Sequence, residues 1–506
     1  MKISKKTIDQ IKPAVEVQIP HSGSFRLPEK VLQFGTGVLL RGLPDYFIDQ
    51  ANKQGIFNGR IVMVKSTDHG DTHSFDLQDN IYTLCVRGLQ NGGKVEEYFL
   101  NNAVSRVLNA QSDWDQILQC AALKAMEIVI SNTTEVGIQL TEDDITRKPP
   151  ASFPGKLLGF LYARYQAFGG DKESGMVIIP TELISDNGLK LKNILIQLAE
   201  KNSLSQSFIH WLTTCNTFCN SLVDRIVPGK PDKADKEEIE KKLGYEDDLL
   251  ICAEPYRLWA IESPDSKTAE ILSFGITAKG IILSEDISKN RELKLRLLNG
   301  THTFSCAMAY LKGFETVKET TGDPAMNFFI RSLMREEIVP SVTGDKIGED
   351  EALRFSTDVL DRFSNPYMIH RWLSIAVQYT FKLRMRCVPV LLSYYNRTHE
   401  IPRLMAQSFA AYIIFMKSEK RHDGLFYGSY GDKEYLIQDD YALFLHQWWN
   451  QFPKNPVKAV LSDIRLWGIN LSEVLGLVEE IEKYISLWGE ANKIILAAFN
   501  ENEDLL

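Results

Sequence analysis

The sequence predicts an α/β domain in its first half and a mostly helical domain in its second half. Short apolar strands alternate with helical periodicity through the first half, as in VLQFGTG (31–37) and GRIVMVKST (59–67). Beyond residue 286 the strand patterns end, and helical periods follow one another, for example at 348–363. Alternating strands and helices are typical of a parallel sheet covered by helices. We therefore expect an α/β domain over residues 1–284 and an all-helical domain over residues 285–506.

The composition is that of an acidic globular protein. Of the 506 residues, 44 % are hydrophobic and 24 % are charged, and the formal net charge is −9. No basic run is dense enough for a nucleic-acid binder, and no stretch approaches the ~20 apolar residues that span a bilayer. We expect a cytoplasmic protein with a small-molecule partner, no nucleic-acid partner and no membrane partner. Its seven cysteines fit reduced thiols, and the charge-dense segment 230–242 is expected to be a solvated surface insertion.

A glycine turn connects the first predicted strand to the first predicted helix, in FGTGVLLRG (34–42). In a dinucleotide-binding β-α-β unit the pyrophosphate lies at the helix N-terminus, and glycines permit its close approach. Gly35 and Gly37 fit the first two glycines of that pattern, whereas Leu40 stands at the third. Asp68, after the second strand, is the candidate for the ribose and for a preference of NAD over NADP. The cofactor-binding candidates of the turn are Phe34, Gly35, Thr36 and Gly37. A turn that binds no ligand is the alternative.

Two later strands also end in polar residues. The strand in MEIVISNTTEVG (126–137) ends in a polar loop, and in a doubly wound sheet ligands lie at the carboxyl ends of the strands. We therefore expect Asn132, Thr133 and Thr134 to contact the nicotinamide side of the cofactor. The next strand pattern, at 175–188, ends near Asn187.

A third motif stands at the start of the second domain. Lys294, Asn299 and His302 form K-x4-N-x2-H in KLRLLNGTH. On an α-helix Asn299 would lie about 140°, and His302 about 80°, round from Lys294. One side of the helix would then carry an amine, an amide and an imidazole, all of which need partners if buried. An amphipathic helix with a solvated lysine and a core histidine is the alternative.

Two residue pairs have the spacing of metal ligands. These are Cys215 with Cys219, and His69 with His73. Neither pair has a third or fourth ligand at a familiar distance, which a zinc site normally requires. We therefore expect no metal site.

Several segments of the chain resemble the polyol-specific long-chain dehydrogenase/reductase family, also called the mannitol dehydrogenase family. The most specific are NTFCNSLVDRIVP (216–228), KLRLLNGTHT (294–303) and RFSNPYMIH (362–370). The resemblance covers nearly the whole chain. It implies a Rossmann-like NAD-binding domain followed by a mostly helical domain, and a metal-independent, NAD-dependent oxidoreduction of a secondary alcohol.

The resemblance also implies roles for site residues. Lys294 is the general acid/base, Asn299 helps to hold the substrate oxygen, and His302 orients the substrate. An amide and an imidazole would stabilise charge that develops on that oxygen. Many family members carry an asparagine where this chain has Leu183. Asn187 aligns with a different asparagine of that motif and is a candidate substrate contact.

The resemblance leads us to expect reduction of D-tagaturonate to D-altronate in hexuronate breakdown, with fructuronate, mannitol or mannitol 1-phosphate as alternative substrates. A uronate brings a carboxylate, and arginine is the best geometric match for it. In FKLRMR (381–386), Lys382 and Arg386 are four residues apart and can share a helix face, so that Arg384 points elsewhere. We predict Lys382 and Arg386 as carboxylate contacts, with His370 as a third. A solvated basic face is the alternative.

Overall fold

The computed structural model describes residues 1–66, 72–133, 137–276, 279–421 and 423–488. The chain divides into two compact units, Met1–Gly88 with Lys94–Ile287, and Leu89–Gly93 with Ser288–Leu506. The predicted division after residue 284 lies three residues before the one in the structure, which follows Ile287.

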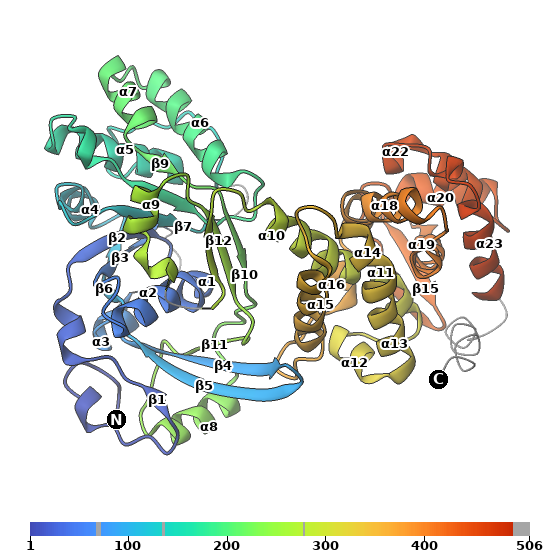
Figure 1. Ribbon diagram of the computed structural model, residues 1–506, viewed down its shortest axis with the longest axis horizontal. Coiled ribbons are helices and arrows are strands. Elements are labelled where there is room, and N and C mark those ends of the chain that lie inside the picture. The colour runs from blue at the N-terminus through green and yellow to red at the C-terminus, as the bar shows by residue number, and fades with distance from the viewer. Residues whose placement is uncertain (67–71, 134–136, 277–278, 422, 489–506) are drawn as a thin grey trace. The chain divides into compact units, whose positions relative to one another are not determined.

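A six-stranded parallel sheet forms the centre of the first unit (Figure 1). Its strand order is β6-β3-β2-β7-β8-β9. The strands are β2 (Glu29–Phe34), β3 (Arg60–Lys65), β6 (Val104–Asn109), β7 (Ile128–Ser131), β8 (Val177–Pro180) and β9 (Thr217–Phe218). Numbered within this sheet in chain order, they run 3-2-1-4-5-6, which is the order of the dinucleotide-binding Rossmann fold. The predicted fold class of this domain is confirmed.

The strands of this sheet are apolar on both faces because helices cover both sides. In β3, Ile61 and Met63 belong to one hydrophobic core, while Val62 and Val64 belong to the other. This alternation follows from the two-residue period of a strand, and burial of both faces is typical of parallel sheets. The first core includes α2 (Pro44–Lys53). The second includes α4 (Trp114–Cys120), α5 (Phe153–Ala167), α6 (Asn187–Lys201) and α7 (Gln206–Thr214).

Two smaller sheets accompany the parallel one. The first contains β1 (Val17–Gln18), β5 (Gly93–Asn101), β4 (Tyr82–Gln90) and β11 (Ile251–Ala253), in that spatial order. The second contains β10 (Ser221–Asp224), β12 (Leu258–Glu262) and β13 (Ile281–Ser284). Short helices α1 (Val38–Gly42), α3 (His73–Leu77) and α9 (Ser266–Ile271) lie between strands.

Most of the charge-dense segment 230–242 is helical, and nearly all of its residues are exposed or partly exposed, as expected of a solvated surface segment. It forms most of α8 (Lys233–Leu243). Ile239 and Leu243 on this helix pack into a buried cluster with Ile8 from the N-terminal region. The helix is amphipathic, so its charges lie on the sides that do not pack.

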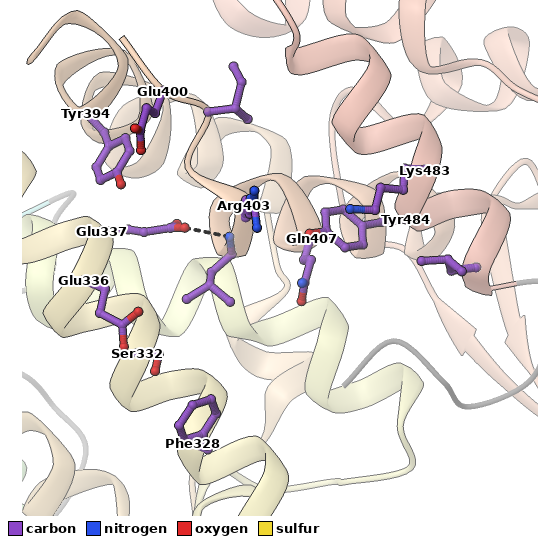
Figure 2. Close-up of a pocket in the computed structure, with 13 residues that line it drawn as sticks. Phe328, Ser332, Glu336, Glu337, Tyr394, Glu400, Arg403, Gln407, Lys483 and Tyr484 are labelled. Atoms are coloured by element: carbon purple, nitrogen blue, oxygen red, sulfur yellow. Dashed lines mark hydrogen bonds between the residues drawn. The ribbon is translucent and has the colours of Figure 1, made fainter. Parts of the chain in front are cut away.

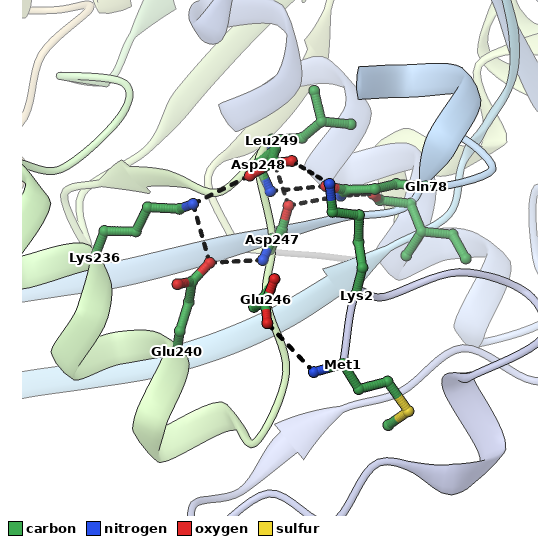
Figure 3. A network of polar contacts seen from close by, with 10 residues as sticks. Met1, Lys2, Gln78, Lys236, Glu240, Glu246, Asp247, Asp248 and Leu249 are labelled. Atoms are coloured by element: carbon green, nitrogen blue, oxygen red, sulfur yellow. Dashed lines mark hydrogen bonds and ion pairs between the residues drawn. The ribbon is translucent and has the colours of Figure 1, made fainter. Parts of the chain in front are cut away.

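A polar network fixes the loop after α8 to the N-terminus of the chain, as Figure 3 shows. Asp247 is fully buried and accepts hydrogen bonds from Gln78 Nε2 at 2.8 Å and from the backbone N–H of Thr83 at 2.6 Å. Burial raises the pKa of Asp247, and these donors oppose the rise. The amino group of Met1 lies 3.5 Å from Glu246.

The second unit is mostly helical, as predicted. Three helical segments in the described part of this unit are π-helices, namely η5 (Lys294–Gly300), η6 (Leu333–Ile338) and η7 (Leu383–Cys387). Its other helices are α10 (Ser288–Leu293), α11 (Thr301–Leu311), α12 (Val317–Gly322), α13 (Pro324–Ser332), α14 (Val339–Val342), α15 (Glu349–Phe363), α16 (Trp372–Ile375), α17 (Tyr379–Lys382), α18 (Val388–Thr398), α19 (Arg403–Phe415), α20 (Ala442–Gln451), α21 (Val457–Ser462), α22 (Ile464–Trp467) and α23 (Leu477–Trp488).

The expectation that this second domain contains helices alone was wrong. β14 (Glu419–Lys420), β15 (Phe426–Tyr430) and β16 (Lys433–Leu436) form a three-stranded antiparallel sheet. Tyr430 pairs with Lys433, so a two-residue loop joins β15 to β16, and Gly431 supplies the positive φ that such a loop needs. The strands are too short to give a clear periodicity in the sequence. Within the described part of the chain, no helix is both long and apolar enough to cross a membrane.

Candidate active site

The two glycines of the turn after β2 have different reasons to be glycine. Gly35 has φ +128°, and a Cβ there would lie 2.9 Å from Leu40 Cδ1 and 3.2 Å from the Asn132 carbonyl oxygen. Its backbone conformation and surroundings therefore require glycine. Gly37 has an ordinary φ of −64°, and a Cβ there would meet no atom within 4 Å.

The space around the Cβ position of Gly37, the residue that precedes α1, is therefore free of protein atoms. The chain order reverses between β2 and β7, so this turn and the end of β7 lie at the switch point where Rossmann folds bind dinucleotides. The helix predicted after the turn ends at Gly42, and Leu43, with φ −133° and ψ −75°, separates it from a new helix that begins at Pro44.

The other two residues of the turn contribute unequally. The Phe34 ring is fully buried and packs edge-to-face on Phe153 with ring centroids 5.3 Å apart. A cofactor contact through that ring is therefore excluded, and only the Phe34 backbone lies at the sheet edge, where its carbonyl accepts the Asn132 N–H at 3.1 Å. Thr36 is partly buried at the edge itself. Asp68 and Thr134 lie outside the described residues.

Glu182 holds the loop that follows β7. Its carboxylate accepts hydrogen bonds from the Thr133 N–H at 2.8 Å, Thr133 Oγ1 at 3.0 Å and Ser131 Oγ at 3.2 Å. Burial raises the pKa of Glu182, and these donors oppose the rise. Asn132 is tied to the next strand as well, since its Nδ2 donates to Thr181 Oγ1 at 3.0 Å. The predicted cofactor contacts Asn132 and Thr133 thus lie at the switch point on an anchored loop.

Asn187 has a structural role in place of the predicted substrate contact. Its Nδ2 donates to the carbonyls of Pro180, Glu182 and Ser221 at 3.0–3.1 Å, and its Oδ1 accepts the Ser221 N–H at 2.9 Å. Only 1 % of the residue is exposed. An amide has two donor hydrogens and one acceptor oxygen, so little capacity remains for a substrate.

The chemistry motif of the second unit lies on a π-helix, and the expectation of an α-helix was wrong there. η5 runs from Lys294 to Gly300, and α11 continues from Thr301. In a π-helix residue i bonds to residue i+5, so Lys294 and Asn299 are one turn apart on the same side. The five-residue spacing, which would separate them by about 140° on an α-helix, here brings them together. Both are partly buried.

His302 is a buried, neutral imidazole. It is 8 % exposed, and its ring stacks on Phe363 with centroids 4.1 Å apart. Burial lowers the pKa of His302 well below 6.5, and the nearby His370, Arg362 and Arg386 lower it further. Its Nε2 has no hydrogen-bond partner among the described residues. A buried ring nitrogen without a partner can serve a ligand group.

Three basic side chains lie near this imidazole, those of Arg362, His370 and Arg386, and Lys382 lies near His370 and Arg386. We call these four side chains together with His302 the basic cluster. Burial lowers the pKa of His370 and of Lys382. Arg362 and Lys382 lower that of His370 further, and Arg386 lowers that of Lys382, while Cys306 and Asp439 partly oppose the change at Lys382. Burial also lowers the pKa of Arg386. Groups that disfavour one another's charge would be relieved by an anion.

The two predicted carboxylate contacts are oriented by local hydrogen bonds. Lys382 Nζ donates to the Ile375 carbonyl at 2.9 Å. Arg386 Nη1 donates to Thr303 Oγ1 at 3.3 Å, one residue after His302. Arg384 points elsewhere, as expected, since a Cβ on Gly468 would lie 2.8 Å from its Nη2.

A cavity of the same unit suits an anion less well than the basic cluster does. It measures about 320 Å³ and is bounded by α13, η6, α19 and α23 (Figure 2). The Glu337 carboxylate there accepts the N–H groups of Leu404 and Met405 at 2.7 and 2.8 Å, so it caps α19. Burial raises the pKa of Glu337 to about 8. The lining includes Glu336 and Glu400 as well as Arg403 and Lys483, so acids offset the cations.

In the first unit, a groove of about 850 Å³ includes Gly175, Val177 and Thr217. These residues lie at the amino ends of β8 and β9, opposite the edge where parallel sheets bind ligands. In the described part of the chain, no group of three or more His, Cys, Asp or Glu residues is arranged to hold a metal ion.

Two family models match the chain. The mannitol dehydrogenase Rossmann domain matches residues 29–272, and the mannitol dehydrogenase C-terminal domain matches residues 286–488. A protein named altronate oxidoreductase from Halalkalibacterium halodurans is 38 % identical over 475 residues, which are 92 % of this chain and 91 % of that protein. The chain belongs to the mannitol dehydrogenase family. The altronate oxidoreductase of Bacillus subtilis is also 38 % identical, over 91 % of this chain and 92 % of its own.

Membership of the mannitol dehydrogenase family makes this protein an oxidoreductase that acts on CH–OH groups. Two solved structures share its fold. The Pseudomonas fluorescens mannitol 2-dehydrogenase, in a ternary complex with NAD and D-mannitol, has a TM-score of 0.67 and 19 % identity over the full length of both chains. A D-sorbitol dehydrogenase in substrate-free form has a TM-score of 0.74 and 20 % identity, over 96 % of this chain and 97 % of its own.

Sequence reasoning missed three residues that organise the candidate regions of this mannitol dehydrogenase family member, one in the first unit and two in the second. Arg362 is the first residue of RFSNPYMIH, but nothing in the motif distinguishes its role from that of its neighbours. Glu182 was visible only as a polar residue after a strand. Arg296, between Lys294 and Asn299, donates hydrogen bonds to two backbone carbonyls of η7, and no spacing in the sequence predicts these contacts.

Proposed function

We propose that this protein is an NAD-dependent reductase that converts D-tagaturonate to D-altronate, reversibly and without a metal. The names of its curated relatives support a sugar-acid substrate. The observation that carries the proposal is the basic cluster around His302. Five basic side chains in one partly buried region fit a substrate that brings its own negative charge.

The residues at the switch point fit a dinucleotide. Gly37 leaves space before the N-terminus of α1, where backbone N–H groups can receive a pyrophosphate. Asn132 and Thr133 stand at the end of the adjacent strand on a loop fixed by Glu182. Bound NADH would supply the hydride that the carbonyl carbon accepts.

The chain's own residues handle the oxygen and its proton. Lys294 gives a proton to the carbonyl oxygen as the C–H bond forms, so the ketone becomes a secondary alcohol, and it takes that proton back in the reverse direction. Asn299, one π turn along, donates a hydrogen bond to the same oxygen. His302 is neutral, and its Nε2 hydrogen-bonds a substrate hydroxyl.

The remote carboxylate of the substrate binds Arg386 and Lys382, with His370 and Arg362 beside them. Charged hydrogen bonds of this kind contribute about 1.5–3 kcal/mol each. A ketose without a carboxylate would leave these cations without that partner, which favours the uronate.

We further propose that Asp68 gives the preference for NAD, because a carboxylate binds the ribose hydroxyls and repels a 2′-phosphate. Asp68→Ala is expected to narrow the difference between the KM values for NADH and NADPH. An unchanged ratio of the two KM values would remove this role.

The function is tested by NADH oxidation with D-tagaturonate, D-fructuronate, D-fructose and fructose 6-phosphate, before and after exhaustive treatment with EDTA. The proposal predicts the highest kcat/KM with D-tagaturonate and no loss with EDTA. A preference for D-fructuronate would change the substrate within the same class. A preference for the ketose or its phosphate, or activity that only zinc restores after EDTA, would refute the proposal.

A further inference from the structure

A proline interrupts the helix that carries Lys382 and Arg386. α17, η7 and α18 form one continuous helical run from Tyr379 to Thr398, and Pro389 lies inside it. A proline has no N–H, and its ring crowds the carbonyl four residues earlier. The carbonyl of Met385 is therefore left without its α-helical donor, and the run passes this point as the π turn η7.

A proline follows the end of a π-helix by two residues at η6 as well as at η7, but not at η5. η6 ends at Ile338, two residues before Pro340, just as η7 ends at Cys387, two residues before Pro389. η5 has no proline after it, and α11 continues from Thr301. Two of these three π turns thus have a cause in their own sequence, whereas the turn that carries Lys294 depends on its surroundings.

Arg296 of η5 supplies the donor that Pro389 lacks. Its Nη1 donates to the Met385 carbonyl at 2.6 Å and to the Arg386 carbonyl at 3.1 Å. Its Nε donates to Glu292 Oε2 at 2.9 Å, and its side chain is only 14 % exposed. One guanidinium of η5 thus bridges two successive carbonyls of η7, at Met385, which is exposed, and at Arg386, which is partly buried, and it connects the backbone of η7 to η5.

The Arg386 side chain is held from the same side. Its Nη1 donates to Thr303 Oγ1 at 3.3 Å, and Thr303 Oγ1 donates to the Asn299 carbonyl at 2.7 Å. The two segments lie close together at Gly300, where a Cβ would be in ordinary van der Waals contact with the Arg386 carbonyl oxygen at 3.9 Å. The proposed carboxylate contact and the proposed oxygen contact are thus parts of one hydrogen-bonded unit.

We propose that Arg296 is a positioning residue for substrate specificity, which holds the π turn of η7 open and thereby directs Arg386 at the substrate carboxylate. This inference rests on the proposed function. Arg296 itself donates to backbone carbonyls and to Glu292, and it acts on the substrate through Arg386.

The test is a double-mutant cycle on kcat and KM with D-tagaturonate, using Arg296→Met, Arg386→Gln and the double variant. Arg296→Met should raise KM about tenfold to hundredfold, because small displacements of a binding group have effects of that size, with kcat nearly unchanged. The double variant should be no worse than Arg386→Gln within about twofold, because residues that act through one another are not additive. Arg296→Lys keeps a donor and should recover much of the loss.

The matched control is Arg335→Met, which removes an exposed arginine from the π-helix η6 and should leave both constants as in wild type. Thermal unfolding and NADH affinity are measured for each variant. If Arg296→Met does not fold, the same cycle with Arg296→Gln, which keeps a polar side chain but is too short to reach both carbonyls, decides the matter.

Losses that multiply in the double variant, or a fall in kcat at constant KM, would overturn the inference. An equal loss with D-tagatose, which lacks the carboxylate, would also overturn it. These outcomes leave the proposed function intact when wild type reduces D-tagaturonate. A wild type that is inactive on every keto-hexuronate refutes the proposed function and this inference together.

Discussion

The two glycines of the β2–α1 turn allow folding and cofactor binding to be separated. At Gly37 a valine meets no protein atom at its Cβ and keeps an allowed φ of −64°. Loss of a good N-cap costs up to about 1 kcal/mol, while a less flexible unfolded chain returns about 0.4–1 kcal/mol. The net change in the free energy of unfolding for Gly37→Val should therefore be near zero.

Binding of the dinucleotide should respond very differently. A valine side chain at Gly37 would occupy the approach to the first N–H groups of α1, and loss of one charged hydrogen bond corresponds to about 1.5–3 kcal/mol. The Kd for NADH, measured by quenching of tryptophan fluorescence, should rise about tenfold to a hundredfold. Thermal unfolding followed by circular dichroism should give a Tm close to that of wild type.

Gly35→Ala is the matched control for folding. At φ +128°, with a Cβ 2.9 Å from Leu40 Cδ1, alanine should destabilise the protein by about 1–3 kcal/mol from backbone strain alone. A Gly37→Val variant that binds NADH as tightly as wild type would refute the assignment of the dinucleotide to this turn. So would a Gly37→Val variant whose weaker binding is matched by an equal loss of stability.

Three further predictions concern single residues. Lys294→Ala should lower kcat by about 10²–10⁴-fold with the Kd for NADH unchanged; a variant that keeps a tenth of the wild-type kcat would count against the acid/base role. Folding raises the pKa of Glu337 from 4.5 to about 8 and therefore favours its protonated form. As the pH rises from 4.5 to 8, the free energy of unfolding should fall by on the order of 4 kcal/mol. Urea unfolding of wild type and Glu337→Gln across this range should show that loss in wild type alone, and parallel curves would contradict it. His302 has its folded pKa lowered below 6.5, so the unfolded state binds its proton more readily and stability falls as the pH drops below 6.5. His302→Phe should reduce this acid sensitivity, and an unchanged dependence of Tm on pH would mean that His302 is not buried and neutral.

The Rossmann domain could be predicted because its signals are local. Buried parallel strands are apolar on both faces, and a glycine turn must follow the first of them, so VLQFGTG indicated both. The polar residues after the strands were harder to assign. Asn132 and Asn187 look alike in the sequence, but Asn187 satisfies the backbone of three segments while Asn132 lies at the sheet edge. Only the register of distant strands separates the two cases.

In the helical domain, by contrast, the geometry of the candidate residues could not be predicted from local signals. K-x4-N is ambiguous on an α-helix and becomes a common face on a π-helix, yet nothing in 294–302 indicates the π turn. The turn depends on packing against other segments, and periodicity alone does not detect such packing. Pro389 and Arg296 lie 93 positions apart in the chain, so no local pattern connects them. The grouping of Lys382 with Arg386 could be predicted because both lie within one helical turn.

The central claim is that the basic cluster recognises a carboxylate on the substrate. The most direct measurement is kcat/KM for D-tagaturonate and for the uncharged D-tagatose, with wild type, Arg386→Gln and Lys382→Met. Each substitution should lower kcat/KM for the uronate about tenfold to a hundredfold, because one charged hydrogen bond contributes about 1.5–3 kcal/mol. The value for the ketose should stay nearly unchanged. Equal losses on both substrates would contradict it and would favour a dehydrogenase for neutral polyols.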